Sequence, residues 1–137
     1  MKLTRTEDYA ILIMAYLAER YGLRLVSLTE LAQVYHISAF FLKNIALQLR
    51  HAGLIESKEG FHGGYQLAKP PQEISIGEII RAVGGPLEVL LCTSEKREGA
   101  CGIESHCRPK AILQKISSDL TRVLDSTNLG VVREYIH

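Results

Sequence analysis

The chain has 137 residues, of which 47% are hydrophobic and 23% are charged, and its formal net charge is +1. This composition is typical of one folded domain and excludes a disordered tail. A net charge so close to zero also excludes a polybasic surface, so any binding of nucleic acid depends on a local patch of the fold.

The first predicted helix covers about residues 4–21 and contains an apolar run at 9–18. A helix that is apolar on nearly all its sides is expected to be buried, as a central strut or across a dimer. The run is too short for a bilayer, which takes ~20 residues. Glu7 and Asp8 precede it where a signal peptide would be basic. We therefore expect no membrane segment and a cytoplasmic protein whose cysteines stay reduced.

Two short helices are predicted next. Ser27 and Glu30 have the spacing of a capping box at the start of the first of them. After a tight break at 36–38, Ser38 is expected to cap the second, which ends at 52–53. Helical spacing predicts a buried face on this second helix made of Leu42, Ile45, Ala46 and Leu49.

A β-hairpin is predicted directly after the two helices. Residues 54–58 and 65–68 have the pattern of strands on either side of a glycine-rich turn at 59–64. Ser75 and Glu78 then repeat the capping-box spacing at the start of another short helix.

The last predicted helix begins at Pro109, which suits a first helical turn, and runs to about Asp125. Its apolar residues step by three, four and three positions, which is the seam of a short coiled coil. The predicted dimerisation residues are Leu113, Ile116, Leu120 and Val123.

Two capped helices followed by a hairpin form a winged helix-turn-helix, so the predicted fold is mainly α with a small β-hairpin wing and a long C-terminal dimerisation helix. The second helix fits the major groove of double-stranded DNA, and the wing reaches the neighbouring backbone or minor groove. Amide side chains bond adenine edges and lysine suits guanine, while a helix N-terminus binds phosphate. The residues predicted to contact DNA on this helix are Ser38, Phe40, Lys43, Asn44 and Gln48.

A different interpretation fits the same helices. Helix pairs also occur as plain packing units, and exposed Phe40 and Leu47 would equally mark a protein contact. The wing that directly follows them favours DNA binding.

The three cysteines, Cys92, Cys101 and Cys107, share one loop. Thiolates bind zinc and iron–sulfur clusters, but these spacings match neither zinc knuckles nor common ferredoxin runs. The pattern therefore leaves open an iron–sulfur cluster, a zinc site, a thiol switch, or a structural metal in a module that does not bind DNA. His106, Glu104, Glu7 and Asp8 are all candidates for a fourth ligand. No catalytic arrangement is recognisable, so the chain is not expected to be an enzyme.

Specific motifs resemble the Rrf family of bacterial winged-helix regulators over essentially the whole chain. They are Leu3-Thr4, Asp8-Tyr9-Ala10, the helix pair, Gly63-Gly64-Tyr65-Gln66-Leu67-Ala68, Ile76-Gly77-Glu78-Ile79-Ile80 and the triple-cysteine loop. The resemblance implies a homodimer that binds a palindromic operator, most simply as a repressor. It also implies that the second helix meets DNA together with a wing that presents Lys58, Gly63 and Gly64.

The resemblance further implies an iron–sulfur cluster on the three cysteines that senses nitric oxide, redox state or iron supply. IscR-type members of the family place a histidine three residues after the third cysteine, where this chain has Lys110. NsrR-type members use an acid near the N-terminus of the partner subunit, and Asp8 stands at that place. This match favours a 4Fe-4S cluster over 2Fe-2S, with an IscR-like regulator of cluster-assembly genes as the alternative.

Two other positions depart from the IscR type. Glu59 stands in the wing where that type has an arginine, and Lys43 replaces an acid of the second helix. We therefore expect weaker contact through the wing and a different DNA sequence. The expected domains are a DNA-binding domain at 1–84, a cluster-binding loop at 85–108, and a dimerisation helix with its tail at 109–137.

Overall fold

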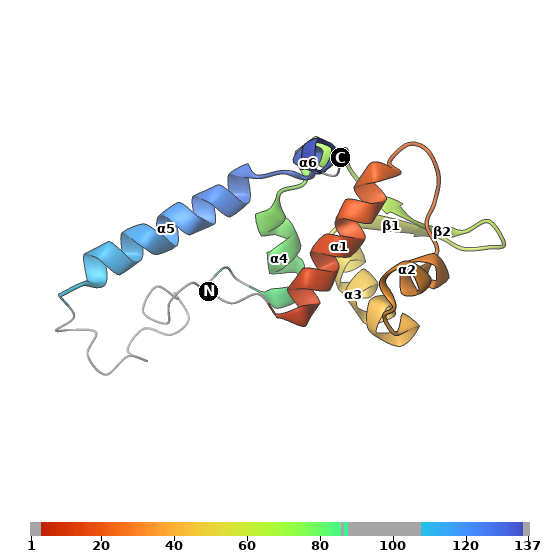
Figure 1. Ribbon diagram of the computed structural model, residues 1–137, viewed down its shortest axis with the longest axis horizontal. Coiled ribbons are helices and arrows are strands. Elements are labelled where there is room, and N and C mark those ends of the chain that lie inside the picture. The colour runs from red at the N-terminus through yellow and green to blue at the C-terminus, as the bar shows by residue number, and fades with distance from the viewer. Residues whose placement is uncertain (1–3, 86, 88–107, 136–137) are drawn as a thin grey trace.

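The computed structural model describes residues 4–85, 87 and 108–135 (Figure 1). Its elements are α1 (Arg5–Glu19), α2 (Leu28–Tyr35), α3 (Ala39–His51), β1 (Ile55–Lys58), β2 (Gly64–Leu67), η1 (Pro71–Glu73), α4 (Ile76–Gly84), α5 (Lys110–Ser126), η4 (Leu129–Val131) and α6 (Val132–Tyr135). The predicted fold class is confirmed. In Figure 1, α1 lies between α4 and the α2–α3 pair, the hairpin projects from one side of the body, and α5 extends away on the other.

Helix α1 is the central strut of the body. Its buried residues are Ala10, Ile13, Met14, Leu17 and Ala18, and they share one core with residues of α2, α3, α4 and the wing. Leu12 points away from this core and is exposed. No helix in the described part of the chain is both long and apolar enough to cross a bilayer.

The capping box predicted at α2 forms only in part. The Ser27 hydroxyl accepts a hydrogen bond from the Glu30 backbone N–H at 3.1 Å. The Glu30 carboxylate does not reach back to the cap, because Arg24 donates to it at 2.8 and 2.5 Å and the Tyr16 hydroxyl donates at 2.6 Å. The bonds from Arg24 lower the pKa of Glu30 to about 2. The Glu30 carboxylate therefore keeps its charge in mildly acidic solution as well, and its bond from Tyr16 ties α1 to α2.

Helix α3 has the buried face that its period predicts, with Leu42, Ile45, Ala46 and Leu49 all in the core. The turn before it uses a left-handed backbone at His36, where φ is 53°. Ser38 occupies the N-cap position, as expected, but its side chain makes no capping hydrogen bond. The prediction of a side-chain cap was wrong, and the first N–H groups of α3 are left without one.

The wing is an antiparallel pair in which Ile55 faces Leu67 and Lys58 faces Gly64. Val26 extends it, because its N–H donates to the Tyr65 carbonyl at 2.9 Å and its carbonyl accepts from the Tyr65 N–H at 2.7 Å. A Cβ atom on Gly64 would lie 2.8 Å from the Val26 oxygen. Glycine at 64 is therefore required by this close approach.

The C-terminal segment returns to the body after α5. The Ile76 N–H donates to the Thr127 carbonyl at 2.8 Å, and the Leu129 N–H donates to the Ile74 carbonyl at 2.9 Å. Leu129 is buried in the same core as α1. The sequence pattern did not predict this return, which holds the end of α5 against the start of α4.

Helix α4 has the predicted capping box in full, with Ser75 and Glu78 exchanging hydrogen bonds of 2.8 and 3.1 Å. Farther along α4, Arg81 donates two hydrogen bonds to Asp125 of α5 at 2.6 and 2.8 Å. A Cβ atom at Gly77 would lie 2.1 Å from the Asp125 carboxylate. The glycine thus lets α5 approach α4 closely enough for this ion pair.

Candidate nucleic-acid interface

The outer face of α3 is polar and open. The predicted base-contacting residues Lys43, Asn44 and Gln48 are all exposed, since they lie opposite the buried face of the same helix. Phe40 and Leu47 are exposed beside them. This face offers amide donors and acceptors, one cation and apolar surface, which are the groups that read base edges in a major groove.

The N-terminus of α3 differs from that of α1. At α1, the Glu7 carboxylate accepts hydrogen bonds from the backbone N–H and the hydroxyl of Thr4, and Asp8 adds a second negative charge. At α3 the first turn contains no acid and no side-chain cap. The partial positive charge of this terminus is therefore available to an anion such as a DNA phosphate.

A cavity of about 500 Å³ lies beside the start of α3. It is lined by Thr4, Arg5, Thr6, Tyr9, His36, Ile37, Ser38 and Phe41. The structure therefore brings the predicted contact Ser38 together with Arg5, an exposed cation. Sequence reasoning missed Arg5, because nothing in the local pattern places the start of α1 next to the turn before α3.

The wing stands directly after α3. Lys58 is exposed at the end of β1, and Gly63 and Gly64 form the other side of the turn. A Cβ atom on Gly63 would lie 2.1 Å from the Lys58 carbonyl oxygen, so both glycines are needed for the hairpin itself. Their contact with DNA stays a prediction. Arg50, which the sequence analysis also missed, donates from α3 to the Ser57 hydroxyl of β1 at 3.0 Å.

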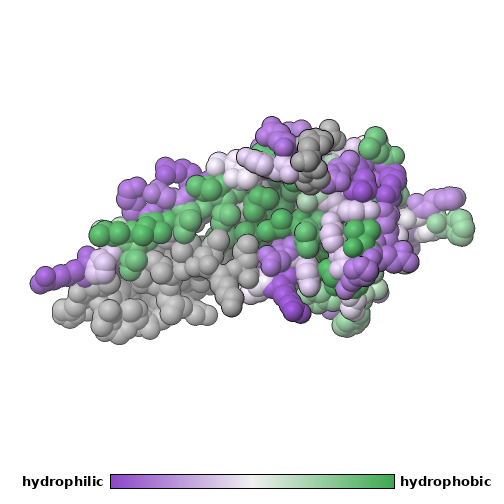
Figure 2. Space-filling view, viewed as in Figure 1, coloured by the Kyte–Doolittle hydropathy of each residue, from purple (hydrophilic) through white to green (hydrophobic). Residues whose placement is uncertain are grey.

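Helix α5 carries an apolar strip that is exposed in the described part of the chain. Figure 2 shows apolar residues following this helix away from the body. Three of the four predicted dimerisation residues are exposed and Leu113 is half-buried. The exposed members of the strip are Ile112, Ile116, Leu120 and Val123.

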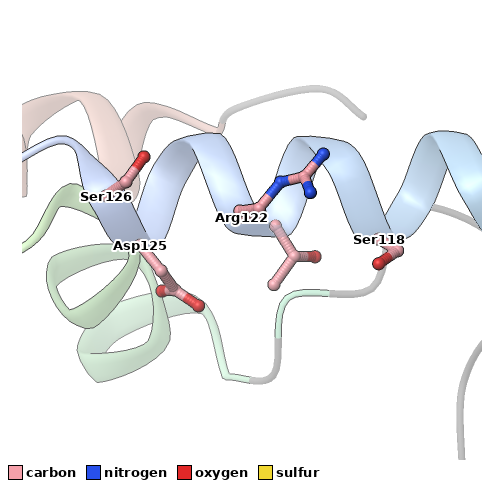
Figure 3. Close-up of a pocket in the computed structure, with 5 residues that line it drawn as sticks. Ser118, Arg122, Asp125 and Ser126 are labelled. Carbon is pink, nitrogen blue, oxygen red and sulfur yellow. The ribbon is translucent and has the colours of Figure 1, made fainter.

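A second face of α5 is polar where the helix meets the body. A hollow of about 550 Å³ is lined by Ser118, Thr121, Arg122, Asp125 and Ser126 (Figure 3). Asp125 turns toward α4, where Arg81 holds the pKa of its carboxyl below the ordinary value through their hydrogen bonds. This ion pair joins the C-terminal end of α5 to α4.

The predicted cluster ligands Cys92, Cys101 and Cys107 lie outside the described residues. Within the described ranges there is no group of three or more His, Cys, Asp and Glu side chains that would hold a metal. Asp8, the predicted fourth ligand, is exposed on α1, and no described residue bonds its carboxylate. The structure also places Glu7 against Gly84, since a Cβ atom on Gly84 would lie 2.3 Å from the Glu7 carboxylate.

Comparisons with known proteins agree with this architecture. Residues 3–134 match the Rrf2 family model, described as an iron-dependent transcriptional regulator. The chain is similar to the HTH-type transcriptional regulator NsrR of Shouchella clausii, with 34% identity over 91% of this chain and 83% of that protein.

Two solved structures extend the comparison. CymR, the global cysteine regulator of B. subtilis, has 33% identity and a TM-score of 0.80 over 98% of each chain. T. potens IscR has 28% identity and a TM-score of 0.78 over 100% of this chain and 89% of that one.

Proposed function

The chain belongs to the Rrf2 family of transcriptional regulators, and from this premise we propose that it is a cytoplasmic, dimeric repressor. An iron–sulfur cluster is proposed to control its affinity for a palindromic operator. DNA binding and regulation follow from the family, and its relatives are named as transcriptional regulators rather than enzymes. The dimer, the operator symmetry, the cluster and its signal are the proposed part.

The observation that carries the proposed DNA interface is the combination of a polar outer face on α3 with an N-terminus that has no side-chain cap. Asn44 and Gln48 make paired hydrogen bonds to adenine, Lys43 bonds guanine, and Phe40 contacts a thymine methyl. Ser38 and the free N–H groups at the start of α3 hold a backbone phosphate. Lys58, Gly63 and Gly64 bring the wing to the flanking DNA.

A second copy of the chain is proposed to cover the apolar strip on α5. Leaving Ile112, Ile116, Leu120 and Val123 in water is unfavourable, and pairing two such helices removes them from it. The pair then presents two α3 helices to two half-sites, which is why the operator is expected to be a palindrome.

The cluster is proposed to be 4Fe-4S, held by Cys92, Cys101 and Cys107 with Asp8 of the partner subunit. Three thiolates suit iron, and a carboxylate would be a weaker and more readily exchanged fourth ligand. Of the two acids at the start of α1, Glu7 is engaged with Thr4, whereas the Asp8 carboxylate has no partner among the described residues. When bound, the cluster supplies the chemistry that reacts with nitric oxide or oxidants or responds to iron supply.

The place of the cysteine loop in the sequence suggests how a change at the proposed cluster would alter DNA binding. The loop connects α4 to α5, and α4 packs on both α1 and α3. The Arg81–Asp125 ion pair joins the C-terminal turn of α4 to the C-terminal turn of α5. A change in the loop therefore biases how α4 and α5 sit against the helix that contacts DNA.

Asp8→Ala is expected to leave the fold intact and to shorten the lifetime of the cluster in air, because it removes the proposed fourth ligand. The measurement is anaerobic purification, with iron, sulfide and zinc counted per chain, followed by the decay of the cluster absorption. Iron and sulfide near four per chain are expected for the unmodified protein.

Glu7→Ala is the matched control, since it removes the neighbouring acid, which is the N3 residue of the capping box of α1. It is expected to lower the free energy of unfolding by up to about 1 kcal/mol with little change in cluster lifetime. Equal lifetimes for Asp8→Ala and the unmodified protein would remove Asp8 from the coordination shell, and zinc alone would exclude the cluster.

A thiol switch without a cluster is the second candidate. It is favoured by the likeness to CymR, which is named as a cysteine regulator. A protein that stays colourless and free of metal under anaerobic purification would support it and would leave the DNA-binding interface of this proposal unchanged.

A further inference from the structure

The tip of the wing carries two neighbouring aromatic rings. Phe61 is 99% exposed, more than any other large hydrophobic residue in the described part of the chain. The His62 ring packs edge-on against it, with ring centroids 5.0 Å apart and an interplanar angle of 85°. Apart from this ring contact, the phenyl ring has almost no surface to pack on.

The strands of the wing are held beside α3. Residues 52–54 separate the end of α3 from the start of β1, and the Arg50–Ser57 hydrogen bond joins the two elements. The backbone bonds between Val26 and Tyr65 brace the second strand. The wing therefore projects from a base that is fixed relative to α3.

The wing places its tip beside α3 and beyond the core. From Ile55 to Lys58 the strand advances about 10 Å at the rise of a β-strand, and the turn then carries the chain to Phe61 at the tip. Adjacent major and minor grooves are separated by about half a helical turn of DNA, or about 17 Å. With α3 in the major groove, the tip arrives at the flanking minor groove.

The tip offers apolar surface rather than positive charge. Lys58 and Glu59 are both exposed beside it and carry opposite charges, so the group that the tip itself presents is the phenyl ring. The wing also projects from the side of the body opposite α5 (Figure 1), so the second copy proposed to pair with α5 does not cover Phe61.

We propose that Phe61 is an apolar wedge that enters the minor groove beside each half-site and opens a base step there. The inference rests on the proposed function and adds a specificity-determining residue to it. Inserting a wedge requires partial unstacking, which is easiest at the flexible pyrimidine–purine steps TA and CA. Phe61 thus selects DNA by its deformability, at a position where no hydrogen bond reads a base.

The test is selection from a pool of random-sequence DNA duplexes by four proteins: the unmodified chain, Phe61→Ala, Phe61→Leu and Tyr135→Ala. Tyr135 is 82% exposed on α6 and serves as the matched control for loss of an exposed aromatic side chain. Because Phe61 has almost no packing partners, Phe61→Ala is expected to unfold at the same temperature as the unmodified chain.

The unmodified chain, Phe61→Leu and Tyr135→Ala are expected to enrich TA or CA steps about half a turn outside each central motif. Phe61→Ala is expected to keep the central motif, to lose the preference at the flanks and to bind the selected duplex about tenfold more weakly. A 2-aminopurine placed at the flanking step is expected to brighten on binding of the unmodified chain and to stay quenched with Phe61→Ala.

The selection experiment separates a failure of the Phe61 wedge from a failure of the proposed function. If Phe61→Ala selects the same flanks with the same affinity, the wedge is wrong while the proposed function stands. If the unmodified chain enriches no motif from the pool, the proposed function fails and the wedge fails with it.

Discussion

Ile116→Asp is expected to convert the protein from a dimer to a monomer and to weaken its binding to a palindromic operator by more than about a hundredfold. Ile116 lies at the centre of the exposed strip on α5 and is 46% exposed in the single chain. An aspartate there places two negative charges in the proposed interface, where each would lose its water. A monomer binds DNA through one domain only. It therefore loses the gain in affinity that comes from binding two half-sites at once, which is typically about 10²- to 10⁴-fold.

The measurement is the mass in solution by sedimentation, followed by titration of a two-half-site duplex. Gln114→Asp is the matched control, since Gln114 is exposed on the opposite side of the same helix and gains the same charge. It is expected to remain a dimer. A dimeric Ile116→Asp protein with unchanged affinity would show that the strip on α5 is not the interface.

Asn44→Ala is expected to weaken operator binding by about ten- to a hundredfold and to relax the preference at one base pair of each half-site. One amide that makes two hydrogen bonds to adenine is worth about 1–3 kcal/mol against the wrong base. Asn44 is exposed and lies opposite the core face of α3, so the substitution leaves the packing of the helix intact.

Competition between duplexes that differ at single base pairs measures this effect, and salt dependence separates it from loss of a phosphate contact. Asn44→Ala is expected to change the base preference and to keep the slope of log affinity against log salt. Gln114→Ala removes an exposed amide from α5 and should change neither. If Asn44→Ala has the same preference at every base pair, that side chain does not read DNA.

The parts of the fold that depend on local pattern could be predicted from the sequence. The buried face of α3 follows from residues three and four apart, and both bonds of the Ser75–Glu78 capping box form as expected. The wing follows from its glycines, because the close approach of Gly64 to Val26 admits no side chain. Family membership rested on the same local motifs, and the comparisons confirm it.

The parts that depend on contacts distant in sequence could not be predicted. Glu30 has the spacing of a capping residue, but Tyr16 and Arg24 bind its carboxylate once α1 and α2 pack together. Leu129 enters the core beyond the end of α5, and Arg5 approaches Ser38 across a cavity. None of these contacts has a period or a motif, because each arises only from the assembled fold.

Within the candidate site, the residues set by local helical spacing could be predicted from the sequence and the others could not. Lys43, Asn44 and Gln48 could be predicted as an exposed set because helical period places them opposite the core. The cluster ligands Cys92, Cys101 and Cys107 lie outside the described residues, so they remain a prediction. Asp8 as the fourth ligand also remains a prediction. The structure shows only that the Glu7 carboxylate accepts a hydrogen bond from the Thr4 N–H.

The most direct test of the account is the affinity of the anaerobically purified protein for its selected operator, measured with the cluster intact and again after its removal. Control by the cluster predicts that the two dissociation constants differ by at least about tenfold at one salt concentration, which is the range of allosteric coupling between two sites. Equal constants would mean that the cluster does not control DNA binding. The protein would then be a DNA-binding regulator whose signal enters elsewhere.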